Sequence, residues 1–179
     1  ETLKHLTKVF KYWIAETDID GFRLDTVKHM WTGAVRYFTS QIHEFATSIG
    51  KDNFYIIGEI AGGMKAAINK LQQTGLDAAL GINKIPKRLE NTAKGHREPD
   101  EFFSAFTNVD LPGEDDRKWY RNNVVTMFDD HDMIIQGEHK KRFCAEQKTA
   151  DLLVNALFLN LMSVGIPCLY YGTEQGFDG

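Results

Sequence analysis

Three acidic residues have the type and spacing to do chemistry: Asp25, Glu59 and Asp132. Each follows a short apolar run that is typical of a buried β-strand. Two carboxylates on opposite sides of a glycosidic bond, one ionised and one protonated, are the standard apparatus of glycoside hydrolysis. Asp25 has Arg23 two residues before it and suits the ionised role, whereas Glu59 follows apolar residues, faces other acids and suits the protonated role. Asp132 can accept hydrogen bonds from sugar hydroxyls, and His131 can donate to them.

The pair formed by Arg23 and Asp25 needs an explanation in its own right. Side chains on a strand alternate between two faces, so Arg23 and Asp25 share one face with Gly21. A charged pair at the end of a buried strand is costly to bury. It is therefore either a structural ion pair or part of a functional site.

The elements that must position these acids alternate along the chain. Apolar residues recur with a helical period over 2–15 and again over 27–49, where Gly50 follows as a stop. The complete prediction is helices at 2–15, 27–49, 64–73, 83–107 in two pieces and 146–164, strands at 21–25, 54–58, 76–82, 124–128 and 167–171, and loops at 110–123 and 133–145. This alternation predicts an α/β fold with parallel strands joined by right-handed crossovers.

Sites in parallel α/β folds assemble where the carboxyl ends of the strands meet. Asp25, Glu59 and Asp132 all fall at the ends of predicted strands. Three separate strands that deliver carboxylates to one rim favour a functional site over a structural ion pair.

Composition argues against several other classes of protein. A formal net charge of −4 gives no electrostatic reason to expect a nucleic acid or an anionic membrane as partner. No apolar run approaches the roughly 20 residues of a membrane span. No signal peptide opens the chain, which begins inside a helical pattern, so we expect an excised segment and leave the compartment open.

The predicted interior holds several large side chains. Trp31, Phe38, Phe45 and Phe158 lie on the apolar faces of predicted helices and are expected in the core. Two cysteines make neither a disulfide framework nor a zinc site, so both are expected to be free thiols, with Cys168 packed in the core.

Four stretches of this sequence resemble the signature stretches of the α-amylase family, glycoside hydrolase family 13. They are Gly21–His29, Gly58-Glu59, Phe128–Asp132 and Gly165–Glu174, in the order and spacing of the family. The family forms a (β/α)₈ barrel, the TIM barrel, that acts on α-glucans with retention of configuration. The resemblance implies that residues 1–179 are an incomplete barrel, strands four to eight, without the N-terminal strands, the calcium-binding extension and the C-terminal β domain.

The resemblance also implies roles for individual residues. Asp25 matches the nucleophile, Glu59 the general acid/base and Asp132 the transition-state stabiliser. Arg23 and His131 match partners of the substrate and of the carboxylates at the cleavage subsite. The implied substrate is an α-glucan or a maltooligosaccharide.

Lys28 and His29 resemble a pair that lines the subsites on the leaving-group side in α-amylases and cyclodextrin glucanotransferases. That pair favours an α-1,4-glucan over an α-1,6 linkage. The resemblance further implies calcium in the complete protein, with the backbone carbonyl of His29 as a ligand. One departure is Asp130, where the family usually has Asn; its charge can alter His131 but leaves the three acids intact.

Three hypotheses from different classes stay open. The first is a retaining α-glucan hydrolase, with a transglycosylase of the same family as its close variant. The second is a non-catalytic glucan-binding relative, against which the three intact acids argue. The third is an unrelated α/β enzyme of Mg²⁺-dependent phosphoryl chemistry, for which Ala61-Gly62-Gly63 is a weak phosphate-binding loop.

An incomplete barrel has a physical consequence. A (β/α)₈ barrel typically takes about 250 residues, and five strands cannot close one. The first and last strands would expose unpaired edges. We therefore expect that the isolated segment self-associates through these edges or has them covered, and that it has little or no activity.

Overall fold

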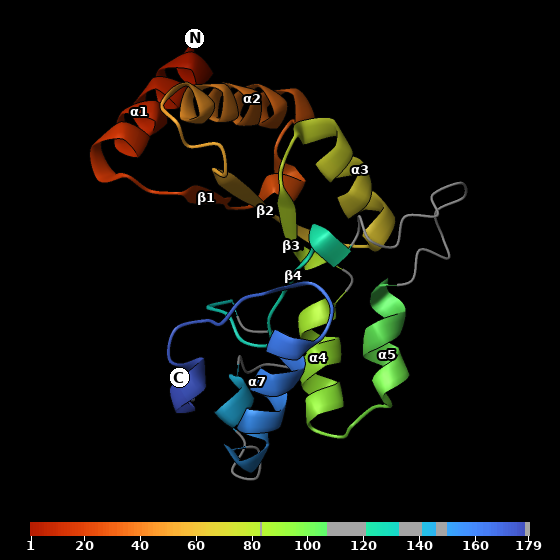
Figure 1. Cartoon of the computed structure of the whole chain (residues 1–179). Coiled ribbons are helices and arrows are strands. Elements are labelled where there is room, and N and C mark those ends of the chain that lie inside the picture. Colours follow the sequence, from red (N-terminus) through yellow and green to blue (C-terminus); the bar gives the residue numbers. More distant parts are fainter. Residues whose placement is uncertain (83, 107–120, 133–140, 146–149, 178–179) are drawn as a thin grey trace. The chain divides into compact units, whose positions relative to one another are not determined.

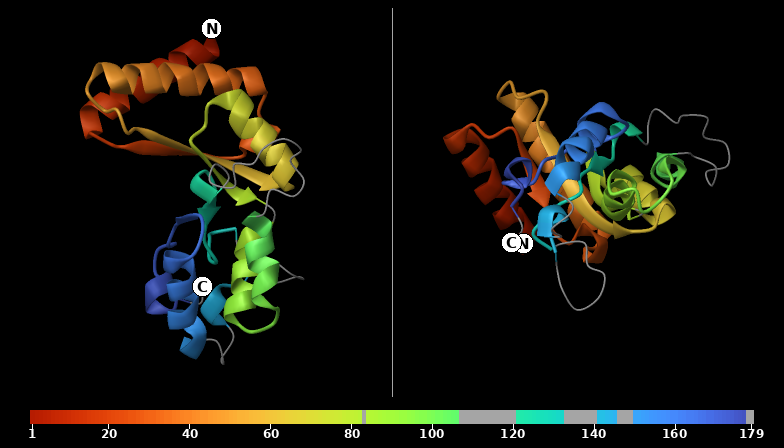
Figure 2. Two further views of the ribbon diagram at one scale, coloured as in Figure 1. Left: turned by 45° about the vertical axis from the view of Figure 1, so that its right-hand side comes forward. Right: turned by 90° about the horizontal axis from the view of Figure 1, so that it is seen from below.

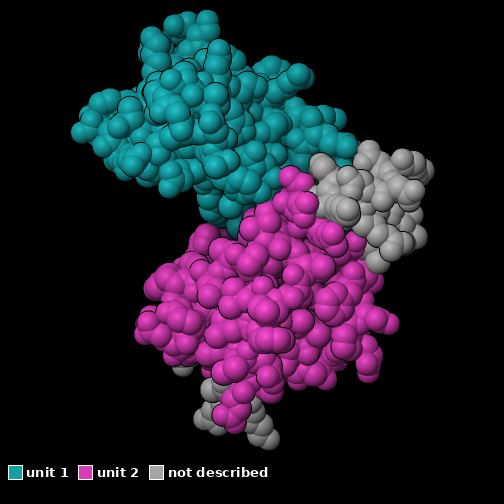
Figure 3. Space-filling model, viewed as in Figure 1, with its two compact units in different colours: residues 1–80 teal, residues 81–179 magenta. Residues whose placement is uncertain are grey.

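The computed structural model describes residues 1–82, 84–106, 121–132, 141–145 and 150–177 (Figure 1). These residues form two compact units, which divide between Leu80 and Gly81 (Figure 3). None of the described helices is long and apolar enough to cross a membrane.

The first unit consists of a sheet with helices packed on it. Its elements are, in chain order, α1 Thr2–Thr17, β1 Gly21–Leu24, the 3₁₀ turn η1 Val27–His29, α2 Thr32–Ser48, β2 Tyr55–Gly62, α3 Met64–Thr74 and the first three residues of β3 Ala78–Ile82. The strands are ordered β1-β2-β3, and β1 runs parallel to β2 with Gly21 opposite Tyr55 and Leu24 opposite Gly58. The predicted α/β class with parallel strands is therefore confirmed.

The face of β1 that packs on the helices is apolar, as the alternation of its side chains predicts. The ring centroid of Phe22 lies 5.2 Å from that of Phe10 on α1 and 6.3 Å from that of Phe38 on α2. Both helices lie on the same side of β1 and β2 in two views (Figure 1 and Figure 2). Arg23, which alternates with Phe22 along the strand, is exposed.

The second helix begins at Thr32 and not, as its apolar pattern predicts, at residue 27. Thr26 takes a left-handed conformation with φ 49°, and Val27–His29 form a single 3₁₀ turn, so the α-helix starts only after Trp31. The expectation that Trp31 lies in the core is wrong. Its side chain is 78% exposed, because Trp31 precedes the helix in an extended conformation and leaves the helix's apolar face.

The end of α2 and its buried face match the prediction. Gly50 has φ 83°, and the N–H of Lys51 donates to the carbonyl of Ala46 at 2.9 Å, which closes the last helical turn. Phe38 is buried and Phe45 is half-buried.

The strand β2 is longer than predicted and holds Glu59 inside the strand instead of at its end. Only its first four residues, 55–58, pair with β1. Ile56 is completely buried, and a Cβ on Gly58 would lie 2.6 Å from Cδ1 of Leu76. The backbone just before Glu59 is therefore held in close contact with the first unit's core.

The second unit pairs two short parallel strands, β4 Val125–Thr126 and β5 Ile166–Pro167. Its helical elements are α4 Ile85–Ala93, α5 Pro99–Phe103, η2 Ser104–Phe106, η3 Phe143–Ala145, η4 Ala150–Leu152, α7 Leu153–Met162 and η5 Thr173–Gln175. α4 packs against both α5 and α7. Both strands are shorter than the predicted 124–128 and 167–171, because only residues 125–126 and 166–167 form backbone pairs between the strands. Most of the predicted loops at 110–123 and 133–145 lies outside the described residues.

The helix α7 is mostly apolar, and the described residues cover only part of it. Ala156 and Asn160 are buried, whereas Val154, Phe158 and Met162 are exposed. The expectation that Phe158 lies in the core is therefore wrong. Phe158 is 66% exposed because it shares the uncovered helix face with Val154 and Met162, four residues to either side.

Neither cysteine forms a disulfide, as expected. Cys168 is half-buried and not fully in the core, at the point where the chain leaves β5. Its backbone N–H donates to the carbonyl of Thr126 at 2.8 Å, and burial raises the pKa of its thiol.

Candidate active site

The best-defined group of chemistry-bearing side chains lies on β1 and β2, where the two strands run side by side. Arg23 Nη1 donates to Asp25 Oδ1 at 2.9 Å, and Arg23 Nη2 lies 3.2 Å from Glu59 Oε2. The pairing of Leu24 with Gly58 places Asp25 opposite Glu59 in the parallel register. One guanidinium therefore bridges two neighbouring carboxylates on the same face of the sheet.

Glu59 is less exposed than Asp25 and contacts a backbone amide as well as Arg23. Its Oε2 accepts a hydrogen bond from the backbone N–H of Thr26 at 3.0 Å, in addition to the contact with Arg23. The side chain of Glu59 is 21% exposed and that of Asp25 is 65% exposed. The surroundings of Glu59 thus differ from the predicted apolar and acidic ones, because a guanidinium and a backbone amide contact it directly.

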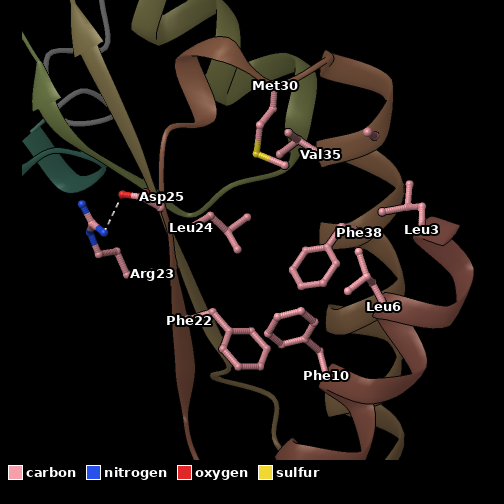
Figure 4. A pocket seen from close by; sticks show the side chains of 11 residues that line it. Leu3, Leu6, Phe10, Phe22, Arg23, Leu24, Asp25, Met30, Val35 and Phe38 are labelled. Atoms are coloured by element: carbon pink, nitrogen blue, oxygen red, sulfur yellow. Dashed lines mark hydrogen bonds and ion pairs between the residues drawn. The ribbon is translucent and has the colours of Figure 1, made fainter.

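An apolar pocket lies beside this polar cluster, between β1 and the helices α1 and α2. Phe22 and Leu24 point toward the helices in this pocket, while Arg23 and Asp25 lie at its edge and point away (Figure 4). Sugar hydroxyls need hydrogen-bond partners, which the apolar lining does not offer. The face that carries the carboxylates is therefore the candidate for binding a sugar.

Lys28 and His29 follow the cluster directly in the chain. Both lie in η1, exposed, while Val27 in the same turn is completely buried and anchors it. The N–H of His29 donates to the carbonyl of Thr26 at 2.9 Å. The fold thus places Lys28 and His29 just beyond the carboxyl end of β1, after Asp25.

The described residues do not by themselves fit a calcium ion. Calcium takes six to eight oxygen ligands, and the prediction from this chain supplies one, the backbone carbonyl of His29. Across the described ranges, no group of three or more His, Cys, Asp or Glu side chains is arranged to hold a metal ion. A calcium site would need ligands beyond these residues.

His131 and Asp132 belong to the second unit. His131 Nε2 lies 3.4 Å from Asp132 Oδ2, and both side chains are exposed. Asp132 stands well beyond the end of β4 at Thr126, so it is not at a strand end as predicted. Asp130 is half-buried, and its Oδ1 has no hydrogen-bond partner among the described residues. The structure gathers the predicted residues into two groups: Arg23, Asp25 and Glu59 in the first unit, and His131 with Asp132 in the second.

Sequence reasoning missed a buried polar network next to His131 and Asp132. Asp129 accepts hydrogen bonds from the N–H of Phe143 at 2.7 Å and from Thr173 Oγ1 at 3.2 Å, and Arg142 Nε lies 3.4 Å from its Oδ2. Burial raises the pKa of Asp129, while these donors and the charge of Arg142 oppose the rise. No spacing rule connects positions so far apart in the chain; the only signal was an acid directly after an apolar run.

Comparisons with known protein sequences agree on one family. A model of the family described as "Alpha amylase, catalytic domain" matches residues 1–179. An α-amylase from Streptomyces lividans is 28% identical over 100% of this chain and 20% of its own length, and a cyclomaltodextrin glucanotransferase from Paenibacillus macerans is 28% identical over 98% and 22%. An intracellular maltogenic amylase from Bacillus subtilis is 29% identical over 100% and 28%. The chain thus spans between a fifth and a third of these relatives.

Solved structures give the same result for the fold. The crystal structure of an Anoxybacillus α-amylase superposes with a TM-score of 0.78 and 25% identity, over 99% of this chain and 36% of that one. A cyclomaltodextrin glucanotransferase with a three-domain distribution superposes with a TM-score of 0.72 and 28% identity, over 97% and 32%. The fold is accordingly an incomplete TIM barrel, as predicted. Since the family match extends over all 179 residues, the chain belongs to the α-amylase catalytic-domain family.

Proposed function

We propose that the complete protein containing this chain is a retaining glycoside hydrolase acting on α-1,4-glucans. Asp25 is the nucleophile, Glu59 the general acid/base and Asp132 the transition-state stabiliser. The observation that carries the proposal is the bridge from Arg23 to both Asp25 and Glu59. In retaining glycosidases the two carboxyl groups are only about 5–5.5 Å apart, and a single guanidinium that contacts both supports such close spacing.

The difference in exposure between the two acids supports this division of roles. Asp25 is the more exposed and can approach the anomeric carbon, where its attack forms a glycosyl ester. Glu59 gives a proton to the leaving oxygen in that step and takes one from water in the next. The hydrogen bond from Thr26 N–H fixes one oxygen of Glu59 and leaves the other for proton transfer.

The proposed substrate is an α-glucan or a maltooligosaccharide. Lys28 and His29 are the proposed contacts on the leaving-group side, because they lie exposed next to Asp25. Structures of related fold have been determined with maltose and with acarbose, which supports an oligosaccharide ligand for this chain as well. Neither a nucleic acid nor a membrane is proposed as a partner.

Self-association of the isolated segment through its sheet edges is a further part of the proposal. β1 forms one edge of the three-stranded sheet among the described residues. Static light scattering of residues 1–179 should give a mass that rises with concentration. A constant monomer mass at millimolar concentration would contradict it.

A transglycosylase of the same family is the second candidate. Cyclomaltodextrin glucanotransferases are among the relatives, with identities close to those of the amylases. The two differ in the acceptor of the glycosyl ester, which is water in one and a sugar hydroxyl in the other. Chromatography of the products from a maltooligosaccharide separates them, since only transfer yields chains longer than the substrate or cyclic products.

The decisive experiment measures turnover of a maltooligosaccharide by the complete protein. Glu59→Gln should lower kcat by about 10²–10⁴-fold because general acid/base catalysis is worth that much. Asp52→Asn, the same acid-to-amide change in an exposed turn, should leave kcat unchanged. Full turnover in Glu59→Gln would reject the proposal.

An aryl maltoside with a good leaving group distinguishes the two roles. Such a substrate needs no proton in the first step, so Glu59→Gln should still release a burst of phenol. Asp25→Asn should release none because it lacks the nucleophile. Equal bursts from both variants would show that the roles are assigned wrongly.

A further inference from the structure

The second unit contains an ion pair that is almost completely buried. Asp129 is 2% exposed and Arg142 is 4% exposed. Taking both charges out of water is costly, and the cost is offset only if their other donors and acceptors are also bonded. An ion pair that is so costly to bury is expected to have a structural or functional role.

Further hydrogen bonds reach Nη2 of Arg142 and both carboxylate oxygens of Asp129. Arg142 Nη2 donates to the carbonyl of Tyr171 at 3.0 Å and to Thr173 Oγ1 at 3.1 Å. Thr173 Oγ1 in turn donates to Asp129 Oδ2 at 3.2 Å, and the other carboxylate oxygen accepts from Phe143 N–H at 2.7 Å. The result is a closed polar network with one guanidinium at its centre.

This network joins three stretches of chain that β4 and β5 do not hold together by strand pairing: Asp129, Arg142-Phe143 and Tyr171–Thr173. β4 and β5 pair over only two residues each, and the chain beyond β4 leads to His131 and Asp132. The network holds this chain at Asp129, two residues before His131. Side-chain hydrogen bonds therefore fix the chain beyond β4, where no backbone pairing between strands continues.

The aromatic contacts of the guanidinium reach His131 as well. Arg142 Cζ lies 5.2 Å from the ring centroid of Tyr170 and 5.8 Å from that of Tyr171. The ring of Tyr170 lies 6.3 Å from that of His131, which contacts Asp132. Arg142 is thus linked to His131 in two ways. One is its ion pair with Asp129, two residues earlier in the chain, and the other is its contact with the ring of Tyr170, which lies near His131.

We infer that Arg142 is a positioning residue that fixes His131 and Asp132 for catalysis. The inference rests on the proposed function, in which Asp132 stabilises the transition state. Loss of the guanidinium releases the 129–132 segment and displaces the carboxylate of Asp132. A misplacement of about 1 Å in a catalytic group can cost about 10²-fold in rate.

The test uses the complete protein and a maltooligosaccharide substrate. Arg142→Met should lower kcat by about 10²-fold with little change in KM, since the transition state loses more than the bound substrate. Arg142→Lys should lose nearly as much, because an ammonium cannot bond Asp129 and the Tyr171 carbonyl in the fork geometry of Arg. Arg97→Met, which removes an exposed arginine just before α5, should leave kcat unchanged.

A double variant separates positioning from folding. Replacing both partners of a buried ion pair by apolar residues is often tolerated by the fold, so Asp129→Leu combined with Arg142→Met should stay folded and still lose kcat. The NMR signal of the His131 ring should shift in Arg142→Met and not in Arg97→Met. A folded double variant with unchanged kcat, or an unmoved His131 signal, overturns the inference.

The two proposals can fail separately. If Asp25→Asn and Glu59→Gln abolish turnover while Arg142→Met keeps full kcat, only the positioning role of Arg142 is wrong. If the first two variants keep turnover, the proposed function itself is wrong.

Discussion

Thr26 stores backbone strain next to the two acids of the first unit, and its replacement gives a quantitative test. Its φ of 49° and ψ of 31° are left-handed, a conformation that costs an L-residue with a Cβ about 1–2 kcal/mol. A β-branched side chain is especially unsuited to it. The same conformation aims the backbone N–H of Thr26 at Glu59. Strain at this residue is thus coupled to the placement of the proposed acid/base.

Glycine should relieve this strain. Thr26→Gly removes about 1–2 kcal/mol of conformational penalty and loses about 0.5–1 kcal/mol to the greater freedom of glycine in the unfolded chain. The net effect is between no change and about 1.5 kcal/mol of stabilisation. Thr26→Ala deletes the same side-chain atoms beyond Cβ but keeps the penalty, so it should be about 1 kcal/mol less stable than Thr26→Gly.

Urea unfolding followed by tryptophan fluorescence provides the assay. The chain has three tryptophans, of which Trp13 and Trp31 lie in the first unit. A Trp119→Phe background therefore restricts the signal to that unit. Thr26→Pro should unfold at far lower urea, because proline cannot adopt a positive φ and has no N–H to give Glu59. The reasoning is refuted if Thr26→Gly is less stable than Thr26→Ala.

Three other predictions concern packing, pH and thiol reactivity. Ile56→Ala should destabilise the first unit by about 2–5 kcal/mol in the same assay because Ile56 is completely buried, and half-buried Ile57→Ala should cost less. Burial raises the pKa of Asp129 above the ordinary 3.8, so the native state binds this proton more tightly than the unfolded state. The stabilisation of the native state by the protonated Asp129 carboxyl is complete below pH 3.8 and is lost as the pH rises through the native pKa. Asp129→Asn has no carboxyl to titrate, so it should flatten that part of the stability–pH curve. In a Cys144→Ser background, iodoacetamide at pH 8 should alkylate Cys168 more slowly in the native protein than in guanidinium, since burial raises the pKa of its thiol; equal rates would contradict the burial.

The features that sequence predicts well here are those that depend on local periodicity. A strand has a side-chain period of two, so the separation of Arg23 and Asp25 from Phe22 follows from the order of residues alone. The end of α2 at Gly50 is local in the same way, because a glycine suits the left-handed turn that closes a helix. The proximity of Asp25 and Glu59 could be expected because each follows an apolar run that forms a strand.

The features that sequence missed depend on contacts between distant residues. The turn at Thr26, which delays α2, is bound to a carboxylate 33 residues further along the chain. The network of Asp129 joins residues 13 and 44 positions away, a separation that no periodicity reports. Trp31 and Phe158 show a second limit, because a pattern identifies an apolar helix face but not whether another element covers it.

The guanidinium of Arg23, placed between two carboxylates, has a consequence for the reaction cycle under the proposed roles. At the start, Asp25 carries the negative charge and Glu59 the proton, so the cation mainly offsets Asp25. Once Asp25 is esterified by the sugar it is neutral, and the same cation then faces the carboxylate that Glu59 has become. A single fixed cation would thus serve each acid in turn, and net charge beside the sugar would stay constant through both displacements. Arg23→Met should accordingly slow both the formation and the hydrolysis of the glycosyl ester.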